Sequence, residues 1–477
     1  MGYRNTLRRV LLSSALVACV AAPAVPTHTA APAAFIAKPE LVMGPAATLS
    51  NQVASNSQVL PELDYGLFTC QVGEVPGTNC YDPYEIRHAY GTDKLINAGW
   101  DGTGKTIVII DAFQNPNIGL QLSTFDTFYG LPEANFTQIA PQGLTAFDPT
   151  NDDMVGWAEE ISLDVEWAHA IAPGANIVLV LAKSDQDPDI YAATKYAVDH
   201  HLGDVISQSF GEDESCMDPS LLKQQHQMFA EATQKHMTIF ASAGDAGAAQ
   251  VNCAQTAYVK AVSSPAVDPL VTAVGGTSLV AADYTTLNPG AYESESVWNE
   301  PDYGSGGGGF SVLYSEPSYQ RGALWGGHRG VPDVTYNASV DNGVLTFLDI
   351  PGVPEGFYLF GGTSAGSPQW SAITAIADEI NRSDLGFINE ALYRIAAVWP
   401  FYAFSLHDIR VGNNSFGGVT GFAAAPGWDA ASGLGSPQAP ALVGLLLQYV
   451  RFGDGNSEIG QGASMFNNNG HGHMRPH

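Results

Sequence analysis

The sequence is poor in positive charge. Its 477 residues contain 19 Lys and Arg against 48 Asp and Glu, which gives a formal net charge of −29. Nucleic acids and anionic membrane surfaces both attract positive charge, so we expect neither as a partner. An acidic chain suits an acidic medium, because protonation of the carboxylates there relieves their mutual repulsion.

Long apolar runs are also scarce. After the N-terminal region no stretch approaches the ~18 residues that cross a bilayer, so we expect no membrane-spanning helix. The run 10–22 follows three arginines in MGYRNTLRR. This pattern is typical of a signal peptide over residues 1–24 and predicts secretion. Residues 16–19 also fit a bacterial lipoprotein processing box, which would anchor the chain through Cys19.

Cysteine is rare and has no metal-binding spacing. The chain has five cysteines, without a CxxC motif or a Cys/His cluster that would indicate zinc. Apart from Cys19, the remaining four form an even set that can pair in three ways in an oxidising compartment. Proximity in the sequence favours Cys70 with Cys80 and Cys216 with Cys253.

Short β-branched runs alternate with helical stretches along most of the chain. We expect strands at 105–113, 175–182, 204–211, 237–244 and 270–277, with helices over 157–171, 190–201 and 221–234. This alternation predicts an α/β fold with a parallel sheet flanked by helices on both faces. We expect a single large domain at 81–451, a linker or short pro-segment at 25–80 and a disordered tail at 452–477. Catalytic groups should gather at the carboxyl ends of the strands.

The stretch GGTSAGSP contains a candidate nucleophile, Ser364. Its G-x-S-x-G pattern fits the nucleophile of an α/β-hydrolase esterase, for which Asp384 and His407 could be the acid and the histidine. It also fits GTSxxxP, as in subtilisin-like proteases, where the serine opens a helix. Pro368 would then lie in the first turn, where its missing N–H costs no hydrogen bond.

A subtilisin-like serine needs a base. The sequence lacks the HGTHV-type helix whose histidine would serve as that base. The corresponding place reads WAEEISLDVEWAHAI. Glu160 and Asp164 are four residues apart, so a helix brings both carboxyls to one face. His169 is rotated away from that face. We expect Glu159 and Glu166, elsewhere on the helix, to be solvated.

A third candidate lies in ASAGDAG, directly after an expected strand. Gly244 and Gly247 permit the tight turn that would direct Asp245 into a cleft. Subtilisin has an asparagine at the comparable position, which donates a hydrogen bond to the oxyanion. An aspartate donates only when it is protonated, a state that burial and neighbouring carboxylates favour.

Together these motifs resemble those of the sedolisins, the serine-carboxyl peptidases, over residues 81–449. The order is E-x-x-x-D, A-G-D-x-G, VTAVGGT, SGGGGFS, RGVPDV, GGTSxxxP and GWDxxSGLGSP. The resemblance implies a subtilisin-like fold and an acid-acting serine-type endopeptidase. Carried over to this chain, it implies Ser364 as nucleophile, Glu160 as base, Asp164 as support for Glu160 and Asp245 as oxyanion stabiliser. A carboxylate base suits acid, where a histidine would be protonated.

The resemblance also implies one structural calcium ion near the C-terminus. The carboxylates of Asp408 and Asp429 and the carbonyls of Ile409, Ala425 and Gly427 would be the ligands. Calcium prefers such oxygen ligands.

We expect a monomer that acts on protein or peptide substrates, through a pocket built from 306–311 and the turn after Ser207. The chain departs from the family in three ways: the segment before the domain is shorter than the usual prodomain, Phe210 replaces a common tryptophan, and Asp111 stands where some members have a glutamate. Besides the esterase, a catalytically weak relative that binds peptides at the cell surface is therefore an alternative.

Overall fold

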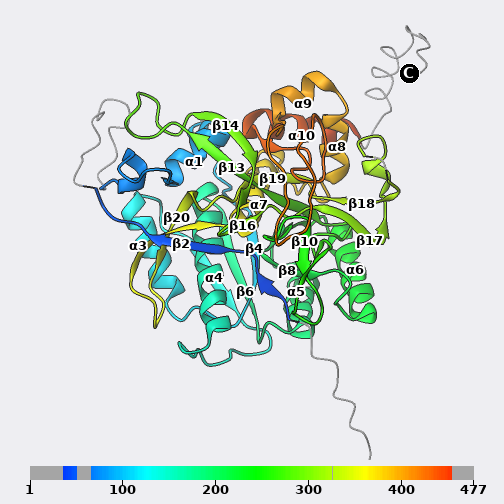
Figure 1. Cartoon of the computed structure of the whole chain (residues 1–477), viewed down its shortest axis with the longest axis horizontal. Coiled ribbons are helices and arrows are strands. Elements are labelled where there is room, and N and C mark those ends of the chain that lie inside the picture. The colour runs from blue at the N-terminus through cyan, green and yellow to red at the C-terminus, as the bar shows by residue number, and fades with distance from the viewer. Residues whose placement is uncertain (1–35, 51–65, 325, 454–477) are drawn as a thin grey trace, which may run out of the picture. The chain divides into compact units, whose positions relative to one another are not determined.

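The computed structural model describes residues 36–50, 66–324 and 326–453 (Figure 1). The predicted signal peptide, Cys19 and nearly all of the predicted tail lie outside these residues. Within the described ranges, no helix combines the length and the apolar character needed to span a membrane.

The core of the fold is an eight-stranded sheet, ordered β14-β13-β9-β7-β4-β6-β5 with β19 beside β13. Every pairing is parallel except that of β14 with β13. The predicted parallel α/β sheet is thus confirmed. The strands are β4 (Thr106–Ala112), β5 (Asn135–Ile139), β6 (Asn176–Ala182), β7 (Val205–Gln208), β9 (Thr238–Ser242), β13 (Thr272–Ala281), β14 (Tyr292–Val297) and β19 (Val334–Asn337).

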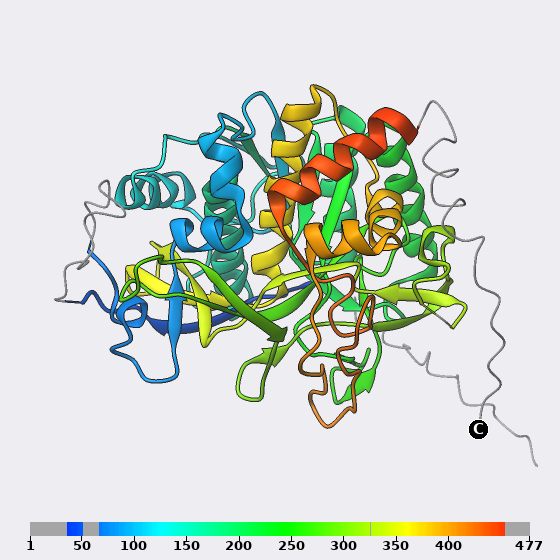
Figure 2. The same cartoon turned by 90° about the horizontal axis from the view of Figure 1, so that it is seen from above.

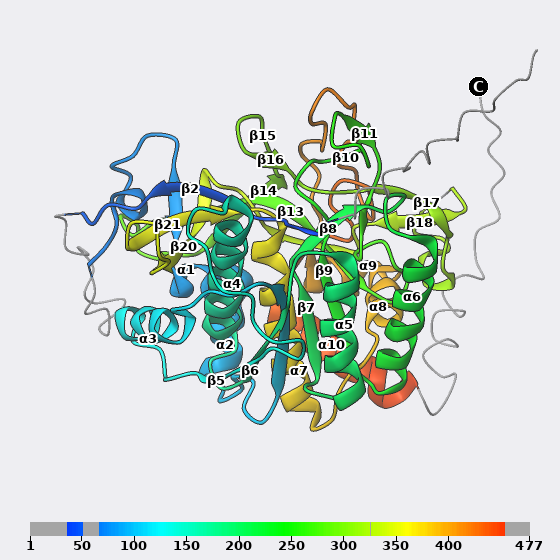
Figure 3. The same ribbon diagram turned by 90° about the horizontal axis from the view of Figure 1, so that it is seen from below.

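Strand β4 shows why the sheet is covered on both faces. Its apolar residues alternate between two buried clusters, with Ile107 and Ile109 in one and Val108 and Ile110 in the other. A strand whose two faces are both apolar needs helices on each side. Helices α4 (Asp152–Ile171) and α7 (Gly366–Asn381) pack mainly in the first cluster, and α5 (Asp187–His200) and α6 (Pro219–Gln234) in the second (Figure 3).

The remaining helices extend these layers. Helices α8 to α10, drawn in orange and red in Figure 2, pack against one another, and α10 also packs against α7. The bounds are α1 (Pro83–Tyr90), α2 (Thr92–Asn97), α3 (Ile118–Tyr129), α8 (Asn389–Ala396), α9 (Trp399–Ser405) and α10 (Ala439–Gly453).

The segment 36–46 crosses the carboxyl edge of the central sheet (Figures 1 and 3). Its strand β1 (Lys38–Pro39) pairs with β8 (Phe210–Asp213), which follows β7. Its strand β2 (Val42–Ala46) belongs to a second sheet, ordered β2-β21-β20-β3. The other strands of that sheet are β3 (Asn79–Tyr81), β20 (Asn342–Leu348) and β21 (Gly356–Gly361). Residues 36–46 are therefore integrated in the fold, although the boundary near residue 80 stays a prediction.

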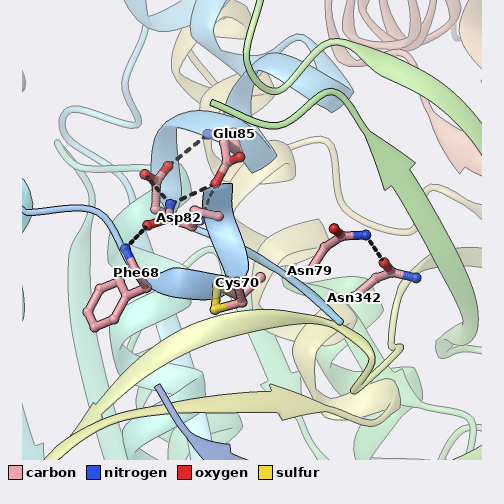
Figure 4. Close-up of a disulfide and its surroundings, with 8 residues drawn as sticks. Phe68, Cys70, Asn79, Asp82, Glu85 and Asn342 are labelled. Carbon is pink, nitrogen blue, oxygen red and sulfur yellow. Dashed lines mark hydrogen bonds between the residues drawn. A yellow bond between two sulfur atoms is a disulfide. The ribbon is translucent and has the colours of Figure 1, made fainter. Parts of the chain in front are cut away.

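Both disulfides have the expected pairing. Cys70 is bonded to Cys80, with Cα atoms 5.3 Å apart, and Cys216 to Cys253, with Cα atoms 5.1 Å apart. The first disulfide ties the short helix Thr69–Val72 to β3, close to the N-cap of α1, where Asp82 accepts hydrogen bonds from two backbone N–H groups (Figure 4). The start of the predicted domain is thus anchored both covalently and by hydrogen bonds.

Two leucines of α3 offer a matched test of the packing. Leu122 is 2% exposed within the core, whereas Leu120 is 66% exposed on the same helix. We expect Leu122→Ala to lower the free energy of unfolding by about 2–5 kcal/mol, because it leaves a cavity. Leu120→Ala should change it by less than about 0.5 kcal/mol. Urea unfolding at acid pH measures both, and equal effects would contradict the described packing.

Candidate active site

Ser364 lies at the junction between β21 and α7. It belongs to a short 3-10 turn, Thr363–Ala365, and Pro368 is the third residue of the α-helix that follows. Its Oγ donates a hydrogen bond to Oε2 of Glu160 at 2.9 Å and lies 3.2 Å from the carbonyl oxygen of Ser209. The serine hydroxyl therefore has a carboxyl group, and not an imidazole, as its partner.

Glu160 and Asp164 are completely buried on one face of α4. The hydroxyl of Ser209 donates to Oδ1 of Asp164 at 2.8 Å. The second carboxyl oxygens, Oε1 of Glu160 and Oδ2 of Asp164, have no hydrogen-bond donor in the described part of the chain. A proton held between the two side chains would satisfy both oxygens, and repulsion would disfavour the doubly charged pair.

Asp111, near the end of β4, adds a third buried carboxyl. Its side chain is inaccessible to solvent, and neither of its oxygens has a hydrogen-bond partner among residues that the structure describes. Burial raises the pKa of Asp111 well above its usual value, and the charge of Asp164 raises it further. Burial, followed by repulsion from Asp164 and Asp111, likewise raises the pKa of Glu160 well above normal. Burial raises the pKa of Asp164 to about 8.

Asp245 follows β9 and lies next to the serine turn. Its Oδ1 accepts hydrogen bonds from the backbone N–H of Thr363 at 2.7 Å and from the Thr363 hydroxyl at 2.9 Å. Its Oδ2 is buried without a partner in the described ranges. Burial raises the pKa of Asp245 to about 7. In acid Asp245 is therefore protonated and can donate a hydrogen bond.

The backbone carbonyl of Glu40 lies at the serine turn, on the same side of Gly362 as Oδ2 of Asp245. The N–H of Ser364 donates to the carbonyl oxygen of Glu40 at 2.9 Å. A Cβ atom on Gly362 would lie 2.5 Å from both that oxygen and Oδ2 of Asp245, and the φ of Gly362 is +92°. Only glycine fits this position. Nothing in the surrounding stretch KPEL predicts a role for Glu40.

The esterase alternative lacks its acid–histidine pair. Asp384 forms an ion pair with Lys105 at 2.6 Å, and His407 stacks on Tyr292 with ring centroids 3.8 Å apart. Neither residue is a partner of Ser364, whose hydroxyl is engaged by Glu160 and Ser209.

The expectation for Glu166 is wrong. Its carboxylate is buried and accepts hydrogen bonds from Gln121 Nε2 at 3.0 Å and from the N–H of Phe347 at 2.9 Å. Strand β20 covers this side of α4 and excludes water there. His169 indeed points elsewhere, with Nε2 2.9 Å from the carbonyl oxygen of Pro132.

Four of the five candidate calcium residues are hydrogen-bonded in two pairs. Oδ1 of Asp408 accepts a hydrogen bond from the N–H of Gly427 at 3.0 Å. Oδ2 of Asp429 accepts one from the N–H of Ala425 at 2.8 Å. Within the described ranges no three His, Cys, Asp or Glu side chains gather as a metal site. A site with two carboxylates would depend on backbone carbonyls for its other ligands.

The donor chemistry of these residues fits a hard cation. The two carboxylates and three backbone carbonyls that the sequence suggests as ligands are all oxygen ligands. Arg410 is a charged competitor, because its Nε donates to Oδ2 of Asp408 at 2.7 Å, and the Tyr402 hydroxyl donates to Oδ1 of Asp408 at 2.9 Å. The Arg410 side chain is half exposed, so it can turn into solvent when a cation competes for Asp408.

Comparison with known proteins is consistent with this geometry. Residues 145–393 match Peptidase_S8, the subtilase family. Kumamolisin of Bacillus sp. (strain MN-32) is 32% identical over 378 residues, which are 77% of this chain and 64% of the relative. Sedolisin of Pseudomonas sp. (strain 101) is 33% identical over 331 residues, which are 66% of this chain and 53% of the relative. These matches thus span less than two thirds of either relative.

The match to one solved structure covers nearly the full length of that structure. It is Pseudomonas sedolisin, a serine-carboxyl proteinase, in complex with two molecules of pseudo-iodotyrostatin. The TM-score is 0.67 at 28% sequence identity, covering 78% of this chain and 98% of the other. The fold around the candidate site is therefore subtilisin-like.

The buried carboxyls predict how stability depends on pH. Their pKa values are raised from 3.8 to about 8 for Asp164 and to about 7 for Asp245. The folded state then binds more protons than the unfolded state between pH 4 and 8, so these groups make the free energy of unfolding fall as pH rises. The loss approaches about 1.4 kcal/mol per pH unit for each proton.

Asp111→Asn isolates this effect, because it replaces one buried carboxyl with an amide of the same shape. We expect urea unfolding between pH 4 and 8 to show a shallower decline for Asp111→Asn than for the unaltered protein. Glu355→Gln, at an exposed position, should leave the decline unchanged. A stability that rises with pH over this interval would contradict the assignment.

Proposed function

Because the chain belongs to the subtilase family, in its sedolisin branch, we propose that it is an acid-acting serine-carboxyl endopeptidase. The observation that carries this proposal is the 2.9 Å hydrogen bond from Ser364 Oγ to Glu160 Oε2. A serine hydroxyl becomes a useful nucleophile when a base within hydrogen-bond reach takes its proton.

The reaction begins at the hydrogen-bonded pair of Ser364 and Glu160 and depends on Asp164. Ser364 Oγ attacks the peptide carbonyl while its proton passes to the ionised form of Glu160, which is available while Asp164 and Asp111 hold the protons of the buried carboxyl group. Asp164 sustains the basicity of Glu160, and the Ser209 hydroxyl orients Asp164 through the 2.8 Å hydrogen bond. Glu160 then returns the proton to the departing amine, and a water molecule repeats the sequence to release the acid and restore the serine.

The oxyanion is stabilised by two donors. One is the backbone N–H of Ser364, just before the N-terminus of α7, where the helix dipole favours negative charge. The other is protonated Asp245, whose Oδ2 is buried without a described partner. Since the pKa of Asp245 is raised to about 7 by burial, this donor is lost above that pH. Activity should therefore decline between acid and mildly alkaline pH.

Endopeptidase action is supported by the course of the segment 36–46. This segment passes the serine with chain on both sides, pairing with β8 before it and with β21 after it. A cleft that accommodates chain on both sides suits cleavage inside a polypeptide.

The proposal also includes secretion of the protein and binding of one calcium ion. The two disulfides suit an oxidising compartment. Asp408 and Asp429, with the carbonyls of Ile409, Ala425 and Gly427, would hold one calcium ion. The ion would neutralise the two carboxylates and rigidify the loop.

Activity of three variants tests the carboxylate mechanism. We expect Ser364→Ala and Glu160→Gln to lower kcat on denatured casein at pH 4 by more than about 10³-fold, because each removes a member of a unit that acts together. His407→Ala, which would disable an esterase, should leave it within about twofold. Circular dichroism verifies folding of each variant. Full activity of Glu160→Gln would refute the proposed base.

Chelation tests the calcium site independently of catalysis. Removing calcium with EGTA should lower Tm, since a ligand present at 100 times its Kd stabilises the folded state by about 2.7 kcal/mol. Asp429→Asn should have a low Tm that calcium does not raise, whereas Asp302→Asn, exposed on another loop, should respond as the unaltered chain does. The same Tm with and without calcium in the unaltered chain would overturn the site.

A further inference from the structure

The segment Ile36–Ala46 is held by the site in the manner of an extended peptide. Lys38 pairs with Gly211 and Pro39 with Phe210 in an antiparallel ladder. The N–H of Glu40 donates to the carbonyl oxygen of Ser209 at 3.1 Å. One edge of the segment is thus bound by the strand that follows β7.

The opposite edge of the segment is bound as well. The N–H of Ala37 donates to the carbonyl oxygen of Asp185 at 2.9 Å, and Ile36 forms an antiparallel bridge with Gln186. The segment therefore inserts as a strand between two edges of the protein, which is a common way to bind a peptide through its backbone.

The Glu40–Leu41 bond lies at the nucleophile. The carbonyl oxygen of Glu40 accepts the Ser364 N–H at 2.9 Å, and a Cβ on Gly362 would contact both this oxygen and Oδ2 of Asp245. The Ser364 N–H and Asp245 are the two groups that would stabilise an oxyanion. From Val42 onward the chain pairs with β21, which leads directly into Ser364. The acyl and amine sides of one specific peptide bond are therefore both fixed.

The Glu40 side chain fills a polar pocket. It is 6% exposed, and its oxygens accept hydrogen bonds from Ser263 Oγ at 2.7 Å and Ser242 Oγ at 2.5 Å. Gly211 forms one wall, where a Cβ would lie 2.5 Å from Oε1 of Glu40 and 1.9 Å from Ser263 Oγ. The pocket thus has hydroxyl donors for a carboxyl and a glycine wall that leaves room for it.

We propose that the Ser242–Ser263–Gly211 pocket selects a glutamyl residue on the acyl side of the cleaved bond, and that Glu40–Leu41, within the bound segment Ile36–Ala46, is a bond that this pocket selects. This inference rests on the proposed peptidase function and deepens it by naming the processed bond and the class of substrate.

The electrostatics of the pocket favour this selection in acid. Burial, and secondarily the charge of Asp245, raise the pKa of Glu40 to about 8. Asp245 is the titratable group that faces Glu40, and both are uncharged in acid. Above both pKa values the two carboxylates would repel each other in a buried site.

The cleavage is an ordinary hydrolysis. Ser364 Oγ bonds to the carbonyl carbon of Glu40, its proton passes to Glu160, and the bond to the Leu41 nitrogen breaks as that nitrogen takes the proton. Water then adds to the ester carbon, releasing a chain that ends in Glu40 and restoring the Ser364 hydroxyl. One water is consumed for each bond cut, and no other reactant is needed.

The first experiment follows the full chain after a shift from pH 8 to pH 4, using mass spectrometry of its termini. We expect a new N-terminus at Leu41, formed at a rate independent of protein concentration, and no such product from Ser364→Ala. Glu40→Gln should be cut at the same place, whereas Glu40→Lys should be cut there at least about 100-fold more slowly, because it buries an unpaired charge. A stable intact segment in a chain that degrades casein would overturn the inference and leave the peptidase function standing.

The second experiment uses peptides of the form Ala-Lys-Pro-X-Leu-Val with X as Glu, Gln, Lys or Leu. We expect kcat/KM at pH 4 to favour Glu over Lys and Leu by at least about 100-fold, since those side chains leave the pocket hydroxyls unpaired. Gly211→Ala should lower kcat/KM for the Glu peptide more than for an X = Gly peptide, which needs no pocket. A preference for Leu would overturn the pocket assignment, and hydrolysis of none of these peptides nor of casein would overturn both proposals.

Discussion

The structure around Ser364 depends on one constraint: several carboxyl groups are buried together and repel one another when ionised. Glu160, Asp164 and Asp111 are inaccessible to solvent, and burial is the largest cause of each raised pKa. A group of this kind cannot ionise completely, because the second charge would repel the first in a medium of low polarity. Protons are therefore retained beside the serine, and the site is suited to acid.

The parallel sheet explains how these groups meet. Strand β4 carries Asp111 near its end, β7 is followed by Ser209, and β9 by Asp245. The carboxyl ends of parallel strands lie at one edge, so residues far apart in sequence arrive together there. Helix α4 presents Glu160 and Asp164 to the same edge from one face. The fold thus assembles an acid site from short local segments.

The sequence predicts the local parts of this site better than the parts that meet through tertiary structure. The spacing of Glu160 and Asp164 encodes a shared helix face, and the order of motifs brings Ser364 into the same family pattern. Glu166 was expected to be solvated, because nothing in its own helix indicates that β20 covers it. No motif in the sequence around Glu40 predicts its burial. The burial follows from pairing of the segment 36–46 with β8 and β21, which are far away in the sequence.

The claim that the buried carboxyls retain protons is tested most directly by NMR titration of Ser364→Ala protein labelled with ¹³C at the Asp and Glu carboxyls. The variants Asp111→Asn and Asp164→Asn assign the signals. We expect at least one carboxyl among Glu160, Asp164 and Asp111 to remain protonated at pH 6, about two units above its usual pKa. Removing the Asp111 carboxyl should let the other two ionise at lower pH. Complete ionisation of all three carboxyls by pH 5 would contradict the claim that the site retains protons.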